Sequence, residues 1–426
     1  MTREMKNSGV EWIGDIPSEW KIRKIKNVCS IYTGNSIKDN EKNNFTDSTN
    51  AIPYIATKEI DVSSSKINYN NGMYIKRDDE NFKVAPKKST LMCIEGGSAG
   101  KKIAYLNQDV CFVNKLCCFS AKSLDDKFLY YYLKSPSFNS EFELHISGLI
   151  GGVSQGELRE FAIPIPPLPE QKRIADFLDS KVIEIDKIIS ETKASIENYK
   201  EYKQSVITEA VTKGLDKNVP MKDSGIEHIG SIPFDWEIKR IKYVLLESGE
   251  RTQTGEEEPL SMSQKFGLIP TKEMDIVPNM ASSFSNCKIV HKNDLVFNKL
   301  KAHLGVFAKS NYDGLVSPDY AVYQPKGNDD IRFLEFVFKT PQYISQFIKY
   351  SKGVAQGLTR LYTEEFFSIF IALPSVEEQQ KITECLDNKC IEIDNLTSEK
   401  EKLITNLEEY KKSLIYEYVT GKKAVE

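Results

Sequence analysis

Asparagine, lysine and histidine side chains follow one another closely in the segment NKLKAHLG, which begins at Asn298. If this segment is a strand, Lys299, Lys301 and His303 occupy alternate positions and face the same side. These residue types reach the edges of guanine and adenine in the DNA major groove. The pattern predicts either a nucleic-acid contact or an ordinary solvated face. The segment FVNKLCC, taken as its counterpart earlier in the chain, contains Asn114 and Lys115.

A glycine-rich segment, EGGSAGKK, begins at Glu95 and invites comparison with loops whose backbone amides and lysine hold phosphates. The details do not fit such a loop. The first glycine is one position short, Lys102 replaces the serine or threonine that would bind Mg²⁺, and IAYL reads as a strand instead of a helix. We interpret the segment as a tight turn exposing Lys101 and Lys102, with a hairpin tip that touches DNA phosphates as the alternative.

Two similar loops, GGVSQG and KGVAQG, place Gln155 and Gln356 at matching positions. We expect these loops to join a variable region to the helix that follows, although Arg360 lies close enough to suggest DNA nearby. Lys58 and Lys272 complete the polar residues expected at loops or strand edges. The predicted DNA contacts are Lys58, Lys101, Lys102, Asn114, Lys115, Lys272, Asn298, Lys299, Lys301, His303 and Arg360.

No combination of residues predicts catalysis by this chain. A DNA adenine methyltransferase would need a glycine-bearing cofactor loop and an Asn/Asp-Pro-Pro-aromatic motif, and neither occurs in the sequence. The eight cysteines contain no CxxC pair, and the four histidines lack metal-ligand spacing with them. We therefore expect reduced thiols, no metal and no cofactor in this chain.

The composition is that of an ordinary globular protein, with 40% hydrophobic and 28% charged residues among 426. The length suggests two to four domains. No apolar run approaches the roughly 20 residues that span a bilayer, and the first residues lack a secretory signal, so we expect a cytoplasmic protein. The net charge of -4 is unusual for a protein that grips DNA alone. Either DNA is not the ligand, or positive surface is local and supplemented by partners.

An internal repeat organises the chain. MKNSGVEWIGDIPSEWKIRKIKNV from Met5 recurs as MKDSGIEHIGSIPFDWEIKRIKYV from Met221, with 14 of 24 positions identical. PPLPEQKRIADFLDSKVIEID from Pro166 recurs as PSVEEQQKITECLDNKCIEID from Pro374. The residues between these blocks share only short islands. Each half therefore has a constant start, a variable middle and a constant end.

Each constant end is predicted to be a long helix. Apolar residues recur at the alternating three- and four-residue spacing of a heptad seam, and the two helices repeat the seam position for position. In the first helix the expected seam is Ile174, Leu178, Lys181, Ile185, Ile188, Thr192, Ser195, Tyr199, Tyr202 and Val206. In the second it is Ile382, Leu386, Lys389, Ile393, Leu396, Lys400, Leu403, Leu407, Tyr410 and Leu414. Gly214 and Gly421 are expected to end the helices.

The variable middles read as mixed α/β units with short strands and with helices near 127–133 and 331–338. The predicted fold is α+β, with two such domains related by the repeat and separated by two long antiparallel helices that form a coiled coil. The expected divisions are a first recognition domain at 1–168, a helix at 169–214, a second recognition domain at 215–375 and a helix at 376–426.

The two pairs of repeated blocks resemble the specificity subunits of type I restriction–modification systems. The resemblance rests on SGVEWIGDIPSEW with its echo SGIEHIGSIPFDW, and on IPIPPLPEQKRIADFLD with its echo IALPSVEEQQKITECLD. It spans the chain from end to end. The second helix block departs from the first in having Ser375 and Val376 in place of Pro167 and Leu168.

The resemblance implies that each variable domain reads one half of a bipartite, asymmetric sequence in double-stranded DNA, while the helices set the unread gap. It also implies two methyltransferase subunits that use S-adenosylmethionine, and two motor/nuclease subunits that use ATP and Mg²⁺. This chain itself is expected to be a non-catalytic subunit. Two alternatives remain: a coiled-coil protein-interaction scaffold, and a specificity module for a methyltransferase that lacks a nuclease.

Overall fold

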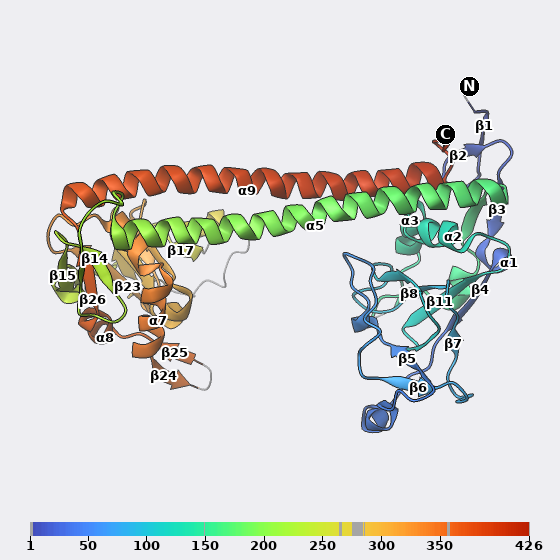
Figure 1. Cartoon of the computed structure of the whole chain (residues 1–426), viewed down its shortest axis with the longest axis horizontal. Helices are drawn as coiled ribbons and strands as arrows, with labels where there is room; N and C mark the ends of the chain where they lie inside the picture. Colours follow the sequence, from blue (N-terminus) through green and yellow to red (C-terminus); the bar gives the residue numbers. More distant parts are fainter. Residues whose placement is uncertain are drawn as a thin grey trace. The chain divides into compact units, whose positions relative to one another are not determined.

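The computed structural model of the chain describes residues 3–148, 150–263, 266–274, 284, 286–355 and 358–425. The chain divides into two compact units, one formed by Met1–Ala194 with Lys400–Glu426 and the other by Ser195–Glu399. Two long helices, α5 (Leu168–Lys213) and α9 (Val376–Val419), contribute residues to both units (Figure 1). Each unit therefore combines one variable middle with a segment of each long helix.

Paired strands from the constant start and the constant end close each unit. In the first unit β3 (Lys21–Lys24) pairs antiparallel with β12 (Ala162–Ile165), and in the second β15 (Glu237–Arg240) pairs in the same way with β26 (Phe370–Leu373). The constant start also forms a hairpin in each unit. These hairpins are β1 (Met5–Asn7) with β2 (Asp15–Pro17), and β13 (Met221–Asp223) with β14 (Ser231–Pro233).

Two four-stranded sheets build the variable middle of the first unit. The first has the order β4-β11-β8-β9, with β4 (Cys29–Thr33), β11 (Leu116–Ala121), β8 (Thr90–Cys93) and β9 (Ile103–Tyr105). The second has the order β6-β5-β10-β7, with β6 (Tyr74–Lys76), β5 (Ala51–Ile55), β10 (Val110–Phe112) and β7 (Val84–Ala85). Shorter elements join them, namely α1 (Ile25–Val28), η1 (Asp39–Phe45) and η2 (Thr57–Glu59).

The second unit repeats the first of these sheets with the same connections. Its order is β16-β23-β20-β21, with β16 (Leu245–Glu247), β23 (Tyr320–Pro325), β20 (Leu295–Asn298) and β21 (Phe307–Lys309). Three two-stranded sheets accompany it: β17 (Leu260–Ser263) with β18 (Gly267–Pro270), β19 (Lys288–Val290) with β22 (Gly314–Val316), and β24 (Lys352–Ala355) with β25 (Leu358–Arg360). Its short helical turns are η3 (Ile241–Tyr243), η4 (Thr271–Glu273) and η5 (Lys299–Leu304).

Short helices pack into the apolar core of each unit. They are α2 (Asp126–Leu133), α3 (Pro136–Leu144) and α4 (Gln155–Leu158) in the first unit, and α6 (Ile331–Phe338), α7 (Pro341–Tyr350) and α8 (Thr363–Ser368) in the second. The helices expected near 127–133 and 331–338 are thereby confirmed. One apolar core per unit joins the sheet, these helices and the long-helix segments.

The long-helix segments run antiparallel, as predicted. In the first unit Phe177 packs against Tyr418 with ring centroids 4.5 Å apart, and Lys411 donates to Asp186 at 2.6 Å. Higher numbers on α5 therefore meet lower numbers on α9. In the second unit Lys203 donates to Asp394 at 2.7 Å. Because Lys411 and Asp394 lie 208 positions after Lys203 and Asp186, the two ion pairs are copies of each other under the repeat.

The predicted seam of α5 is wrong by one residue over part of its length. Val182, Ile189 and Ile196 are buried. Ile188 and Tyr202, which we expected in the seam, are exposed. The buried positions advance by four residues from Ile174 to Leu178 and by four again to Val182, whereas a strict heptad alternates steps of four and three. Two successive steps of four shift the seam by one residue, because one turn of the helix takes 3.6 residues and not 3.5. On α9, Leu403 and Tyr410 are likewise exposed, whereas Ile382, Leu386, Ile393 and Leu414 are buried as predicted.

Both long helices end as the sequence indicates. Gly214 follows α5 with φ of 76° and Gly421 follows α9 with φ of 72°, the left-handed conformation that favours glycine at a helix end. At the start of α9, the Ser375 hydroxyl accepts from the backbone N–H of Glu378 at 3.3 Å. The Glu378 side chain accepts from the indole N–H of Trp236 at 3.3 Å.

Candidate nucleic-acid interface

Two loops of the first unit bring predicted residues together. Lys58 lies on η2, with 82% of its side chain exposed. Lys101 and Lys102 end the loop between β8 and β9, which is the hairpin tip considered above. The Lys102 ammonium donates to the backbone carbonyl of Thr57 at 2.6 Å. Thr57 directly precedes Lys58, so this bond holds Lys102 beside the turn that carries Lys58. Lys101 is exposed beside it.

The turn between β10 and β11 lies against the same loop. The backbone N–H of Ile94 donates to the carbonyl of Lys115 at 3.0 Å, and the Lys115 ammonium is 3.9 Å from Glu95. Asn114 is exposed, and its side-chain oxygen accepts from Ser36 at 2.6 Å. All five residues predicted for the first domain therefore lie on loops that contact one another or on the turns beside them.

The second unit places its predicted residues differently, because NKLKAHLG is not a strand. Strand β20 ends at Asn298, which is 8% exposed and accepts from the backbone N–H of Leu300 at 3.1 Å. This cap starts η5, which ends at Gly305 with φ of 59°. Lys301 and His303 are exposed on η5 but do not share a strand face with Lys299. The prediction of one common face for the three side chains is wrong.

Lys299 is largely removed from solvent. Its side chain is 12% exposed, and its ammonium lies 3.3 Å from Glu247, which also pairs with the buried Lys288. Burial and the neighbouring Lys288 lower the pKa of Lys299, and Glu247 opposes that shift. This geometry makes Lys299 part of an internal ion-pair cluster. Whether it contacts DNA stays a prediction.

Arg360 and Lys272 are more accessible, and each is paired with a carboxylate. Arg360 lies 3.1 Å from Asp319 on the turn between β22 and β23, and its guanidinium stacks over Tyr362 at 5.7 Å from the ring centroid. Lys272, on η4, has a 68% exposed side chain and pairs with Glu258 at 3.0 Å.

No group of three or more His, Cys, Asp or Glu side chains that could hold a metal ion occurs among the residues the structure describes. Within the same residues, no helix is long and apolar enough to cross a membrane.

The candidate interface is a set of polar loops and short turns in each unit, in which several of the cations are paired with carboxylates.

The family model described as the type I restriction modification DNA specificity domain matches the chain twice, at residues 17–198 and 233–408. The two matches cover most of the sequence, one in each half. The chain belongs to this family. It is a specificity subunit, a non-catalytic component of a restriction–modification complex, and it functions with DNA and other subunits of that complex.

Individual relatives agree with this assignment over nearly the full length. The subunit is 24% identical to the type I restriction enzyme MjaVIII specificity subunit of Methanocaldococcus jannaschii, over 96% of this chain and 93% of the relative. It is 23% identical to the EcoBI specificity subunit of Escherichia coli, over 89% and 81%. Among solved structures, the HsdS subunit from Thermoanaerobacter tengcongensis has a TM-score of 0.53 at 16% identity, covering 96% of this chain and 98% of that one. A chain from a structure of type I R-M complex assembly has a TM-score of 0.74 at 15% identity, covering 96% and 99%.

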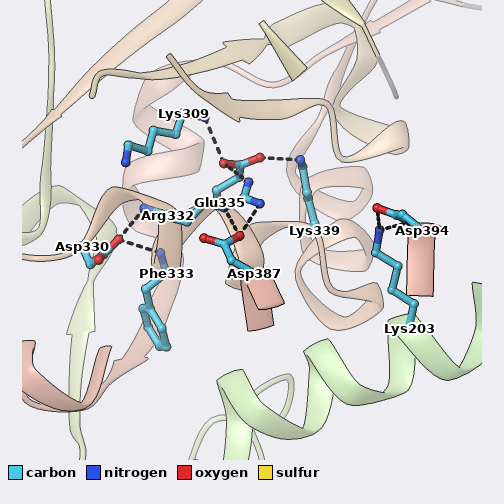
Figure 2. Close-up of polar contacts among 9 residues, drawn as sticks. All are labelled: Lys203, Lys309, Asp330, Arg332, Phe333, Glu335, Lys339, Asp387 and Asp394. Atoms are coloured by element: carbon cyan, nitrogen blue, oxygen red, sulfur yellow. Dashed lines mark hydrogen bonds and ion pairs between the residues drawn. The ribbon is translucent and has the colours of Figure 1, made fainter. Parts of the chain in front are cut away.

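The specificity subunit fixes each recognition domain to its long helix with equivalent polar contacts. In the second unit Arg332 donates to Asp387 at 2.7 and 2.9 Å (Figure 2). Gln379 accepts from the backbone N–H of Asp330 at 2.8 Å. In the first unit the equivalent contacts are Lys127 with Asp179 and the backbone N–H of Asp125 with Gln171 at 2.8 Å. The second unit adds the buried Glu335, whose carboxylate binds Arg332, Lys339 and the Lys309 backbone (Figure 2).

One sequence match between the two domains of the subunit is misleading. The backbone N–H of Val153 donates to the carbonyl of Ile94 after β8, and that of Leu361 donates to the carbonyl of Lys299 after β20. Val153 is therefore equivalent to Leu361, whereas the GVAQG island begins earlier, in the β24–β25 hairpin. Gln155 bonds the carbonyl of Ile31 at 2.9 Å, which supports its structural role. Gln356 lies outside the described residues.

The same topology corrects the pairing of Asn114 and Lys115 with Asn298 and Lys299. The first pair follows β10, whereas the second lies at the end of β20, which is the counterpart of β8. A stronger sequence signal was present elsewhere. Thr-Lys-Glu occurs once in each variable middle, at 57–59 and 271–273, and in both units it forms a short helical turn.

Proposed function

We propose that each recognition domain reads one half of a bipartite, asymmetric DNA sequence, and that α5 and α9 set the gap between the halves. The observation that carries this proposal is the duplicated framework. The same sheet, closing strands and helix contacts occur in both units, while the loops at the sheet ends differ in sequence and conformation. Two such domains would present different side chains to DNA, which favours two different half-sequences over a palindrome.

The long helices are the proposed docking site for two methyltransferase subunits, which would bring S-adenosylmethionine. Two motor/nuclease subunits, with ATP and Mg²⁺, would complete a restriction complex. The duplicated inter-helix ion pairs support two equivalent partners, because each half of the framework would offer the same contacts. We retain the division into 1–168, 169–214, 215–375 and 376–426 as part of this proposal.

Sequencing of methylated bases tests the function directly. We expect a bipartite adenine-methylated motif in a host that carries this subunit with its methyltransferase, and loss of that motif when the subunit is deleted. A methylome without a bipartite motif would instead favour the protein-interaction scaffold.

Lengthening α5 tests its role as a spacer. Insertion of seven residues beside the buried Ile189 adds about two helical turns, so the flanking residues keep their orientation toward the partner helix. It lengthens the helix by about 10 Å. At about 3.4 Å per base pair, the gap is expected to grow by about three base pairs, with both half-sequences unchanged. A second variant with a matching insertion in α9 controls for mispairing of the two helices. An unchanged gap in an active complex would contradict the spacer role.

The isolated subunit is expected to bind DNA weakly. Its net charge is -4, and Lys272, Lys115 and Arg360 already face carboxylates. Addition of the methyltransferase should therefore raise affinity for the methylated motif by at least about 100-fold at 0.15 M salt, because the partner contributes further phosphate contacts. Titration of a fluorescent duplex measures both affinities. Tight, sequence-specific binding by the subunit alone would overturn this expectation.

A further inference from the structure

A hollow with three lysines opens beside η2 in the first recognition domain. Its lining includes Lys58, Lys66 and Lys102, together with the residues from Glu59 to Ser63. Lys58 and Lys66 are exposed to solvent, while Lys102 is anchored by its bond to the Thr57 carbonyl. The hollow therefore concentrates three ammonium groups at the domain's loop end.

The two carboxylates of the hollow are held by their own turns. Glu59 is buried and accepts from the backbone N–H of Ala56 at 3.0 Å, in addition to lying 3.6 Å from Lys58. Asp61 accepts from the Ser64 backbone at 2.7 Å and from the hydroxyls of Ser63 and Ser64, and these bonds lower its pKa to about 2. Three cations and two engaged carboxylates leave a net positive hollow that is suited to an anion.

The second domain retains the lysine of this turn despite the divergence of its loops. In the first unit, β5 lies parallel to β10 and leads into Thr57-Lys58-Glu59. In the second unit, Pro259 lies parallel to Leu315 of β22, the β17–β18 hairpin is inserted, and the backbone N–H of Thr271 then returns to the Pro259 carbonyl at 2.8 Å. Lys272 thus occupies the turn equivalent to that of Lys58.

We propose that the hollow around Lys58, Lys66 and Lys102 binds a phosphate of the DNA backbone, and that Lys272 makes the equivalent contact in the second domain. The two domains are proposed to recognise different half-sequences, yet both have this lysine at the same turn. The bases of the two half-sequences differ, whereas the phosphates of the DNA backbone are the same in both, so a phosphate is the contact that both lysines can make. Phosphate contacts fix position and register, while base edges supply specificity. The inference rests on the proposed function and assigns these lysines to affinity instead of sequence choice.

The test uses the complex of the specificity subunit with its methyltransferase. Lys58→Gln is expected to weaken binding about tenfold for the methylated motif and equally for a duplex with the first half-sequence scrambled, and to reduce the slope of log affinity against log salt by about one. Lys272→Gln should behave alike. The methylated motif should not change. The matched control is Lys122→Gln, an exposed lysine beyond the opposite end of β11 that should alter neither quantity.

Several results would overturn the assignment. A changed base at the first half-site in Lys58→Gln would make this lysine a base reader, and unchanged affinity and salt slope would remove the contact. Lys58-dependent binding of inorganic phosphate that leaves the affinity for DNA unchanged at constant ionic strength would instead indicate a free-anion site. Lys58→Gln alters an exposed side chain, and an unchanged thermal unfolding curve confirms that it folds. If the wild-type complex yields no bipartite motif, the proposed function itself fails, which is a separate outcome.

Discussion

Trp20→Ala is expected to lower the free energy of unfolding of the first unit by about 3–5 kcal/mol. Trp20 is fully buried in the constant start. Its indole N–H donates to Glu170 at the beginning of α5 at 3.1 Å, and the guanidinium of Arg3 lies over its ring at 5.4 Å. The end of α9 packs on the same ring, because a Cβ on Gly421 would lie only 3.0 Å from it. Removing the ring leaves a cavity where the constant start and both long helices meet.

The measurement is hydrogen exchange followed by mass spectrometry at increasing urea, which assigns the loss of stability to peptides of the first unit. Trp20→Phe is the matched control, since it retains most of the apolar volume and loses only the indole hydrogen bond, at an expected cost of about 1–2 kcal/mol. Trp236→Ala is the counterpart in the second unit, where Trp236 donates to Glu378. This substitution should increase hydrogen exchange in peptides of the second unit instead of the first. Equal destabilisation of both units by Trp20→Ala would contradict the local role of this residue.

The framework around these tryptophans was predictable because the sequence repeats it in each half of the chain. Identical glycine, proline and tryptophan positions in the two constant starts, and an apolar period in the constant ends, indicate the elements without knowledge of their contacts. The exact seam was less accessible. A strict heptad selects Ile188, whereas the helix buries Ile189, because seam position depends on the slow drift of a 3.6-residue period against the partner helix.

The loops could not be predicted as well, because their conformation depends on contacts remote in sequence. Alternating cations suggested a strand at NKLKAHLG, but the cap at Asn298 and the left-handed Gly305 make η5 instead. The GVAQG island matched by letters, while the hydrogen bond of Leu361 shows that the equivalent backbone lies further on. The predicted DNA contacts remain predictions. The structure places them on loops, short helical turns and strand ends, and the bases they meet depend on the complex.

Contacts within the second unit illustrate the same limit. Arg332, Glu335 and Asp387 form one ion-pair cluster, although Asp387 is 55 residues beyond Arg332. From the sequence, Glu335 reads as one polar residue within an apolar helix. In the fold its side chain is 3% exposed, and its two oxygens accept from Lys339 at 2.5 Å, Arg332 at 2.8 Å and the Lys309 backbone at 3.1 Å.

Glu335→Gln is expected to destabilise the second unit by about 2–4 kcal/mol at pH 7. The amide keeps the shape of the carboxylate but loses its charge and turns one acceptor into a donor, so either Lys339 or the pair of donors on the other oxygen loses its acceptor. Asp394→Asn is the control, since Asp394 is 63% exposed and pairs across the helices with the partly exposed Lys203. That substitution should cost less than about 1 kcal/mol.

The dependence on pH distinguishes loss of the charge from a simple packing defect. Burial alone would raise the pKa of Glu335, but Lys339 and Arg332 outweigh it and hold the pKa below the ordinary value. A carboxyl with a depressed folded pKa contributes stability that is present above its unfolded pKa, about 4.3, and is lost as the pH falls through the folded value. The difference between wild type and Glu335→Gln should therefore be largest at pH 6–7 and shrink below about pH 4. Urea denaturation of both proteins across this range, with exchange assigned to α6 and β21, measures it. A difference that does not vary with pH would show that the carboxylate charge does not stabilise this unit.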